Sequence, residues 1–197
     1  MKRTLIALAL FAAAGPLAFA DDAPRAENDT QRNVNQQERI EQGLESGELN
    51  TREAARLERQ ETAIERTEAR AMQDGSIDRR EQAVIRAEQN QASRDVYRQK
   101  HDAQQGNPDS ASSQRMQADV ERNANQQARI NQGVESGELT NREAANLEHG
   151  QAKVTRNEAN AGADGHVGAN EQERIQARED HQSNKTYRKK HNAKKHD

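Results

Sequence analysis

The sequence predicts an all-α protein made of two tandem three-helix repeats joined by a flexible linker. Residues 31–102 align without a gap with residues 121–192, and nearly half of the aligned positions are identical. No proline occurs inside either repeat, and Gln, Glu, Arg and Ala, which favour helices, fill the spans between glycines. No stretch alternates apolar and polar residues in the manner of a strand. Together these observations define the fold class.

Glycine turns divide each repeat into three predicted helices. Apolar side chains recur at helical spacing within these spans, as with Ile40 and Leu44 four residues apart. The predicted helices cover residues 30–45, 51–72, 79–101, 118–135, 141–161 and 169–190.

The turns before the second and third helix of each repeat follow one pattern. Each has a glycine, an aliphatic residue two positions later and a glutamate six positions later. A glycine beyond a helix end adopts the left-handed conformation that terminates the helix, and a polar residue three positions before a Glu completes a capping box. We therefore expect turn and cap roles for Gly47, Asn50, Glu53, Gly75, Gly137, Thr140, Glu143 and Gly165.

The apolar core is small, and it is smaller in the second repeat. Three apolar residues of the first repeat are replaced in the second, in the pairs Met72 and Gly162, Val84 and Arg174, and Val96 and Thr186. Each lost side chain removes roughly 1.5–3 kcal/mol of burial. Because stability margins are only about 5–15 kcal/mol, we expect a two-step thermal unfolding in which residues 117–197 melt first.

The N-terminal segment is typical of a secretory signal peptide. Lys2 and Arg3 precede a short apolar run, and Ala18-Phe19-Ala20 supplies the small residues of a cleavage site. Because the run is too short to span a membrane, we expect cleavage after Ala20 and a periplasmic or secreted chain that is not an integral membrane protein. The expected organisation is a signal peptide at 1–20, a loose segment at 21–30, repeats at 31–102 and 117–192, a linker at 103–116 and a basic tail at 193–197.

Composition argues against several classes of function. Without Lys2 and Arg3, the 30 basic residues fall to 28 against 33 acidic ones, a formal charge of −5, which argues against nucleic-acid binding. There is no cysteine, so neither disulfides nor thiol chemistry is available. No nucleophile motif or phosphate-binding glycine loop is present, and little apolar material remains to build a dry pocket. We therefore expect a protein without enzymatic activity.

The Asp-Gly turns resemble the second half of an EF-hand calcium loop, in which a glycine, an aliphatic residue and a final glutamate have the same spacing. The resemblance implies calcium ligands at Asp74, Asp78 and Glu81 in the first repeat and at Asp164 and Glu171 in the second. In the first repeat, an arginine and a methionine stand where the first and third ligands of the loop belong. The alternative, that these carboxylates cap helices, is therefore favoured.

The late histidines form a second candidate metal site. Imidazoles at His181, His191 and His196 suit Cu, Ni or Zn, although their spacing does not place two of them on adjacent turns of one helix. The alternative is that they are solvated polar side chains. The basic cluster over 185–197 suits an anionic surface or an acidic envelope protein, or else it complements the helix dipole.

Each repeat combines a Ser-Gly-x-Leu turn, an Asp-Gly-x-(Ile/Val) turn and a Tyr-Arg-x-Lys-His ending. In this combination the repeat resembles a group of exported bacterial proteins of unknown function. The resemblance implies an all-helical periplasmic protein and supplies no activity. The sequence thus predicts an exported, non-enzymatic binding or envelope-stress accessory module without a cofactor. The alternative is a metal-binding protein that uses the Asp-Gly turns for calcium or the C-terminal histidines for a transition metal.

Overall fold

The computed structural model describes residues 23–192, with side chains from residue 29 onward, and over that range it is all-helical, which confirms the predicted fold class. The helices are α1 (Ala23–Ser46), α2 (Thr51–Ala71), α3 (Arg79–Lys100), α4 (Ala111–Glu135), α5 (Asn141–Ala161) and α6 (Ala169–Lys190). Short 3-10 turns, η1 (Met72–Asp74) and η2 (Gly162–Asp164), follow α2 and α5. The predicted signal peptide at 1–20 and the basic tail at 193–197 lie outside the described residues.

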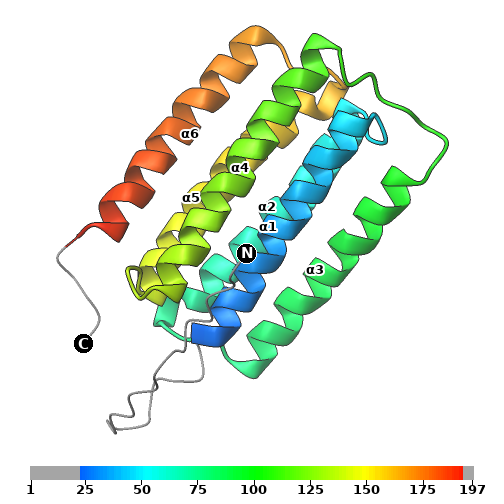
Figure 1. Cartoon of the computed structure of the whole chain (residues 1–197). Coiled ribbons are helices and arrows are strands. Elements are labelled where there is room, and N and C mark those ends of the chain that lie inside the picture. The colour runs from blue at the N-terminus through cyan, green and yellow to red at the C-terminus, as the bar shows by residue number, and fades with distance from the viewer. Residues whose placement is uncertain (1–22, 193–197) are drawn as a thin grey trace, which may run out of the picture.

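The two repeats pack against each other as one helical bundle (Figure 1). Helix α1 packs mainly on α4 and α2 packs on α5, so each inner helix faces its counterpart in the other repeat. Both pairs run antiparallel. Arg52 at the start of α2 donates to the Asp164 carbonyl just beyond α5, at 2.5 Å, and Gln117 near the start of α4 donates to the Leu44 carbonyl near the end of α1, at 3.3 Å. Helices α3 and α6 lie at opposite edges, each against the inner helices of its own repeat.

The apolar core consists of two clusters, and each cluster is shared between the repeats. One combines Ile40 of the first repeat with Val120 of the second, and the other combines Met72 with Ile130. All four side chains are almost completely buried. Because each cluster draws on both repeats, neither repeat has a complete core of its own. In place of the expected two-step unfolding, with residues 117–197 melting first, this packing favours a single transition.

The three apolar residues replaced in the second repeat do not leave its helices incomplete. Val84 is 50% exposed on α3, so its replacement by Arg174 removes no buried group. Thr186 is fully buried and donates its hydroxyl to a carbonyl of its own helix at 3.1 Å. Gly162 lets η2 lie against α2, since a Cβ at this position would fall 2.9 Å from the Ala55 Cβ. The second repeat is as continuously helical as the first.

Four helices begin at the predicted residues, whereas α1 and α4 begin earlier than predicted. Helix α1 starts at Ala23, so the segment 21–30, expected to be loose, is helical from that residue onward. Helix α4 starts at Ala111, inside the predicted linker. Ser110 caps it by accepting from the Ser113 N–H at 3.1 Å. The polar residues around Ser110 conceal this cap in the sequence.

The connection between the repeats packs on the bundle, unlike the flexible linker predicted over 103–116. The Gly106 N–H donates to the Gly47 carbonyl at 2.8 Å. Gly106 also lies so close to the Leu49 backbone that a side chain there would collide with it. The connection therefore belongs to the folded body.

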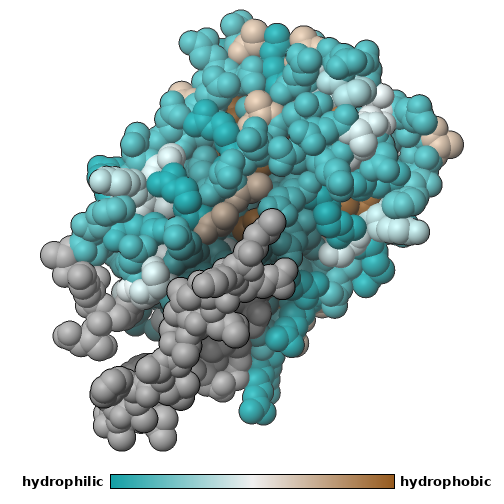
Figure 2. All heavy atoms as spheres, in the orientation of Figure 1, coloured by the Kyte–Doolittle hydropathy of each residue, from teal (hydrophilic) through white to brown (hydrophobic). Residues whose placement is uncertain are grey.

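The bundle presents a mostly hydrophilic surface. On the face shown in Figure 2, apolar residues form only small separate areas among hydrophilic ones. The large apolar or aromatic side chains exposed among the described residues are Val84, Tyr97 and Tyr187. None of the described helices combines the length and hydropathy needed to cross a membrane. Contacts of this surface with other molecules will therefore depend mainly on polar and charged side chains.

Candidate functional site

The four glycine turns are helix junctions. Their glycines all have a positive φ, between 70° and 103°. The glutamate after each turn accepts a hydrogen bond from the backbone N–H three residues before it. At α2 and α5, Asn50 and Thr140 accept in return from the N–H groups of Glu53 and Glu143. Each turn thus ends one helix and caps the next.

The carboxylates considered as calcium ligands accept hydrogen bonds within these turns. Asp74 and Asp164 each accept from the N–H two residues later, at 3.0 and 2.8 Å. Asp78 accepts from two N–H groups at the start of α3. Glu81 and Glu171 accept from the N–H of the cap residue, both at 2.9 Å. The backbone therefore uses oxygens that a cation would need.

An arginine from the other repeat holds each Asp-Gly turn. Arg142 donates to the Asp74 carbonyl at 3.1 Å, and Arg52, its counterpart ninety residues earlier, donates to the Asp164 carbonyl. A guanidinium at the turn opposes a bound cation. Among residues 23–192, no group of three or more His, Cys, Asp or Glu is arranged to hold a metal ion. Through these arginine contacts, the Asp-Gly turns link the two repeats.

The two described histidines that were considered as transition-metal ligands have different surroundings. His181 lines a groove between α5 and α6. His191 stacks on Tyr187, with ring centroids 4.1 Å apart, and a ring nitrogen lies 2.8 Å from the Tyr187 carbonyl. His196 lies outside the described residues.

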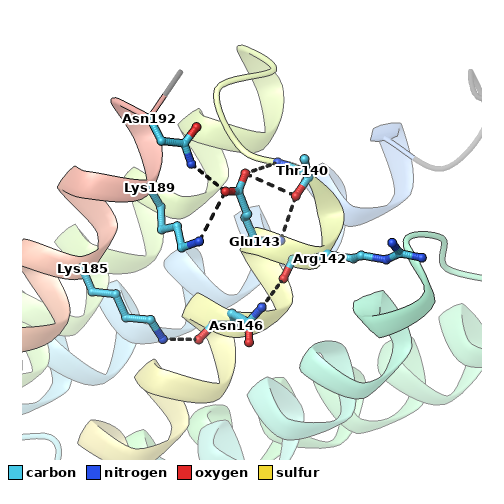
Figure 3. Close-up of polar contacts among 7 residues, drawn as sticks. All are labelled: Thr140, Arg142, Glu143, Asn146, Lys185, Lys189 and Asn192. Atoms are coloured by element: carbon cyan, nitrogen blue, oxygen red, sulfur yellow. Dashed lines mark hydrogen bonds and ion pairs between the residues drawn. The ribbon is translucent and has the colours of Figure 1, made fainter. Parts of the chain in front are cut away.

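The basic end of α6 makes contacts within the molecule, at the start of α5 (Figure 3). Lys189 Nζ lies 3.4 Å from Glu143 Oε1, which also accepts from Asn192 at 2.7 Å. Burial opposes ionisation of Glu143, but the Thr140 backbone, Asn192 and Lys189 together lower its pKa. Part of the basic cluster over 185–197 therefore stabilises the fold.

A row of buried carboxylates lies between the two apolar clusters, and we call it the carboxylate seam. Four glutamates recur every three or four residues along the buried face of α2, and two lie on α5. They are Glu58, Glu61, Glu65, Glu68, Glu148 and Glu158, each at most 2% exposed. The Thr155 hydroxyl of α5 donates to Glu65 of α2 at 3.1 Å. The seam therefore spans the contact between the repeats.

Amide side chains from α1 and α4 face the seam in positions equivalent between the repeats. The donor–acceptor pairs are Gln37–Glu58, Gln127–Glu148, Asn33–Glu68 and Asn123–Glu158. Within residues 23–192, no lysine or arginine forms an ion pair with any seam glutamate. Neither carboxyl oxygen of Glu61 has a hydrogen-bond partner there. The seam thus holds more acceptors than donors.

Burial raises the pKa of every seam glutamate, because a buried carboxylate loses the water that stabilises its charge. The pKa of Glu58 rises to about 8 and that of Glu148 to about 7. The pKa values of the other four lie well above the ordinary value, and the charges of neighbouring seam glutamates raise them further. Arg39 of α1 opposes this rise at Glu61. The seam therefore retains protons at pH values where exposed glutamates are ionised.

Three more buried carboxyls lie beside the seam, on α1, α4 and α6. Burial raises the pKa of Asp29 to about 6, that of Asp119 to about 7 and that of Glu179 to about 8. Arg86 opposes the rise at Asp29, and Arg122 opposes it at the other two. Arg122 Nε lies 2.9 Å from the Glu179 carboxylate.

Sequence reasoning missed the seam because glutamates on helices are usually solvated. The spacing of Glu58, Glu61, Glu65 and Glu68 places all four on one face of α2, and this periodicity was the available signal.

Comparison of the chain with protein-family models, with curated proteins and with solved structures gives no match. The resemblance to exported bacterial proteins of unknown function stays a prediction.

Proposed function

We propose that this chain is an exported, non-enzymatic accessory protein of the cell envelope whose fold is stabilised by protons, suited to acid stress. The carboxylate seam carries the proposal: six glutamates are buried without an ion pair to a lysine or arginine among the described residues. An interior of this kind is most stable when its carboxyls are neutral. The predicted signal peptide at 1–20 supports a location outside the cytoplasm, with cleavage after Ala20.

The direction of the pH dependence follows from the raised pKa values. The ordinary glutamate pKa of 4.5, which applies to the unfolded chain, rises in the folded chain to about 8 at Glu58 and to about 7 at Glu148, and it rises at the other four seam glutamates as well. Between these values the folded chain binds more protons than the unfolded chain, so the free energy of unfolding falls as pH rises. The stabilisation is complete below the unfolded pKa and is lost as pH rises through the folded pKa.

Carboxylates at the turns have the opposite effect. Hydrogen bonds from the Glu81 backbone lower the pKa of Asp78, and hydrogen bonds with Lys100 and Lys190 lower those of Glu48 and Glu138. Their stabilisation is present above the unfolded pKa and is lost as pH falls through the folded pKa. The stability maximum is therefore expected near the ordinary pKa of a carboxyl group, at a pH of about 4 to 5.

Thermal melts of residues 21–197 between about pH 4 and pH 8, followed by circular dichroism, test the proposal. We expect the melting midpoint to be highest in mild acid and to fall steadily toward a pH of about 8. Fractionation of expressing cells, with sequencing of the mature N-terminus, tests export and cleavage after Ala20. A midpoint that is flat, or that rises with pH over this range, would contradict proton stabilisation.

The same melts separate this proposal from metal binding. Ca²⁺, Zn²⁺, Cu²⁺ and Ni²⁺ are added in turn near neutral pH, with a chelator as control. We expect no change in midpoint, because the turn carboxylates already accept backbone hydrogen bonds. A rise that the chelator reverses would replace the proposal by the metal-binding alternative.

A further inference from the structure

A groove of about 510 Å³ runs between α5 and α6, on the outside of the second repeat. Its rim is cationic: it is formed by Lys153 of α5 and by Arg174, Arg178, His181 and Lys185 of α6. The four α6 residues recur every three or four positions and so form one stripe along the helix. From the first to the last, the stripe covers about 16 Å. No carboxylate lines the groove.

The cations of the groove are not neutralised within the molecule. Lys153, Arg174 and Arg178 are exposed, and none of them has an ion pair or side-chain hydrogen bond within residues 23–192. Lys185 donates only to the Asn146 carbonyl, at 2.8 Å. Burial lowers the pKa of Lys185, and repulsion from Lys153 and Lys189 lowers it further. The groove therefore carries a concentrated positive charge that no carboxylate in its lining balances.

The first repeat provides an internal control, because the equivalent positions there carry a different charge. Ninety residues before Lys153, Arg174, Arg178, His181 and Lys185 stand Ala63, Val84, Glu88, Gln91 and Asp95. With histidine neutral, four positive charges in the second repeat correspond to two negative charges in the first. The first repeat forms the same three helices with these residues. The fold therefore does not require the cations.

The groove is also shaped differently from its counterpart. Gly150 lies on its α5 side, where a Cβ would collide with the Gln182 side chain. Gln182 is 3% exposed and donates to the Leu147 carbonyl at 2.8 Å, so it forms part of the floor. In the first repeat, Gln60 takes the place of Gly150 and donates to Asp95 at 2.8 Å. In the first repeat, the Gln60 side chain thus lies across the position that corresponds to the groove. In the second repeat, Gly150 has no side chain and the groove is open.

We infer that the α5–α6 groove binds an extended acidic peptide segment of a partner protein. The step of four residues from Arg174 to Arg178 rises about 6 Å, close to the roughly 6.6–7 Å between alternate side chains of an extended peptide, so two carboxylates of such a peptide can meet these two arginines. Arginine suits carboxylates because its guanidinium forms paired hydrogen bonds. The Val154 and Ala177 side chains in the groove offer apolar contact to the residues between the carboxylates. A purely ionic polymer would leave that contact unused.

Fluorescence anisotropy with a labelled decapeptide of alternating Glu and Ala tests this inference near neutral pH. We expect binding that weakens as salt is added. Arg178→Glu, which restores the first-repeat residue, is expected to weaken binding about tenfold. The combination of Lys153→Ala, Arg174→Val, Arg178→Glu and Lys185→Asp recreates the first-repeat pattern and is expected to abolish binding.

Arg156→Glu is the matched control, because Arg156 is exposed on α5 outside the groove and the net charge changes equally. We expect Arg156→Glu to bind within about twofold of the unaltered protein. Equal losses from Arg156→Glu and Arg178→Glu, or unaltered binding by the fourfold variant, would overturn the inference. Inorganic polyphosphate of equal charge that binds as tightly as the peptide would overturn the assignment to a peptide. Circular dichroism verifies the fold of each variant, and Arg178→Glu keeps the test decisive if the fourfold variant unfolds.

Discussion

Replacing Glu148 by glutamine isolates the contribution of one seam carboxyl to the pH dependence of stability. The pKa of Glu148 rises from 4.5 to about 7 on folding. At about 1.4 kcal/mol per pKa unit, this shift destabilises the folded state by about 3 kcal/mol at pH 8 and by less than about 1 kcal/mol at pH 5. Glutamine is uncharged at every pH, and its amide oxygen still accepts from Gln127, which donates to Glu148 at 2.8 Å. The variant should therefore lack this pH-dependent loss.

The assay is a set of thermal melts of the unaltered chain and Glu148→Gln between about pH 5 and pH 8. The stability of the unaltered chain should fall by about 2.5 kcal/mol more than that of the variant over this range. At roughly 2–4 °C per kcal/mol, the difference in midpoint shift is about 5–10 °C. Glu173→Gln, at an exposed position of α6, should behave like the unaltered chain. Parallel pH profiles for the unaltered chain and Glu148→Gln would refute the reasoning.

Three further predictions concern the fold. Thermal unfolding should show one transition, and residues 110–192, which contain the whole of α4 with its cap, should lack a cooperative melt when expressed alone, because both apolar clusters need both repeats. A cooperative melt of that fragment would contradict the shared core. Met116→Ala should cost about 2–5 kcal/mol in urea unfolding, since Met116 is fully buried where the repeats meet, whereas a loss below about 1 kcal/mol would mean that the site is not packed as described. Asn50→Ala should cost about 1 kcal/mol by removing the α2 cap, and an unchanged urea midpoint would show that the cap contributes nothing.

The helical fold and its turns were accessible from the sequence because local rules decide them. Gly47, Asn50 and Glu53 satisfy capping rules that act within a few residues. The packing between repeats was not accessible, because it depends on contacts between residues far apart in the chain, such as Arg142 with the Asp74 carbonyl.

The carboxylate seam and the α5–α6 groove could not be predicted from the sequence for the same reason. Glu65 looks like any surface glutamate until α5 covers it with Thr155. Arg174 looked like the loss of a core valine, and only the exposure of Val84 shows that it is a surface change. Charge differences between repeats were visible in the sequence, but their convergence on one groove was not.

The reciprocal contacts of Arg52 and Arg142 carry a consequence for the history of the chain. Each arginine reaches the Asp-Gly turn of the other repeat in the same way, as expected for an interface with two-fold symmetry. A chain with a single repeat would have made this interface by pairing with an identical copy, and gene duplication with fusion would then have joined the copies. In such a homodimer both outer grooves must have the same residues. Only after fusion were the two grooves free to differ in charge, so the asymmetry of the groove is younger than the fold that carries it.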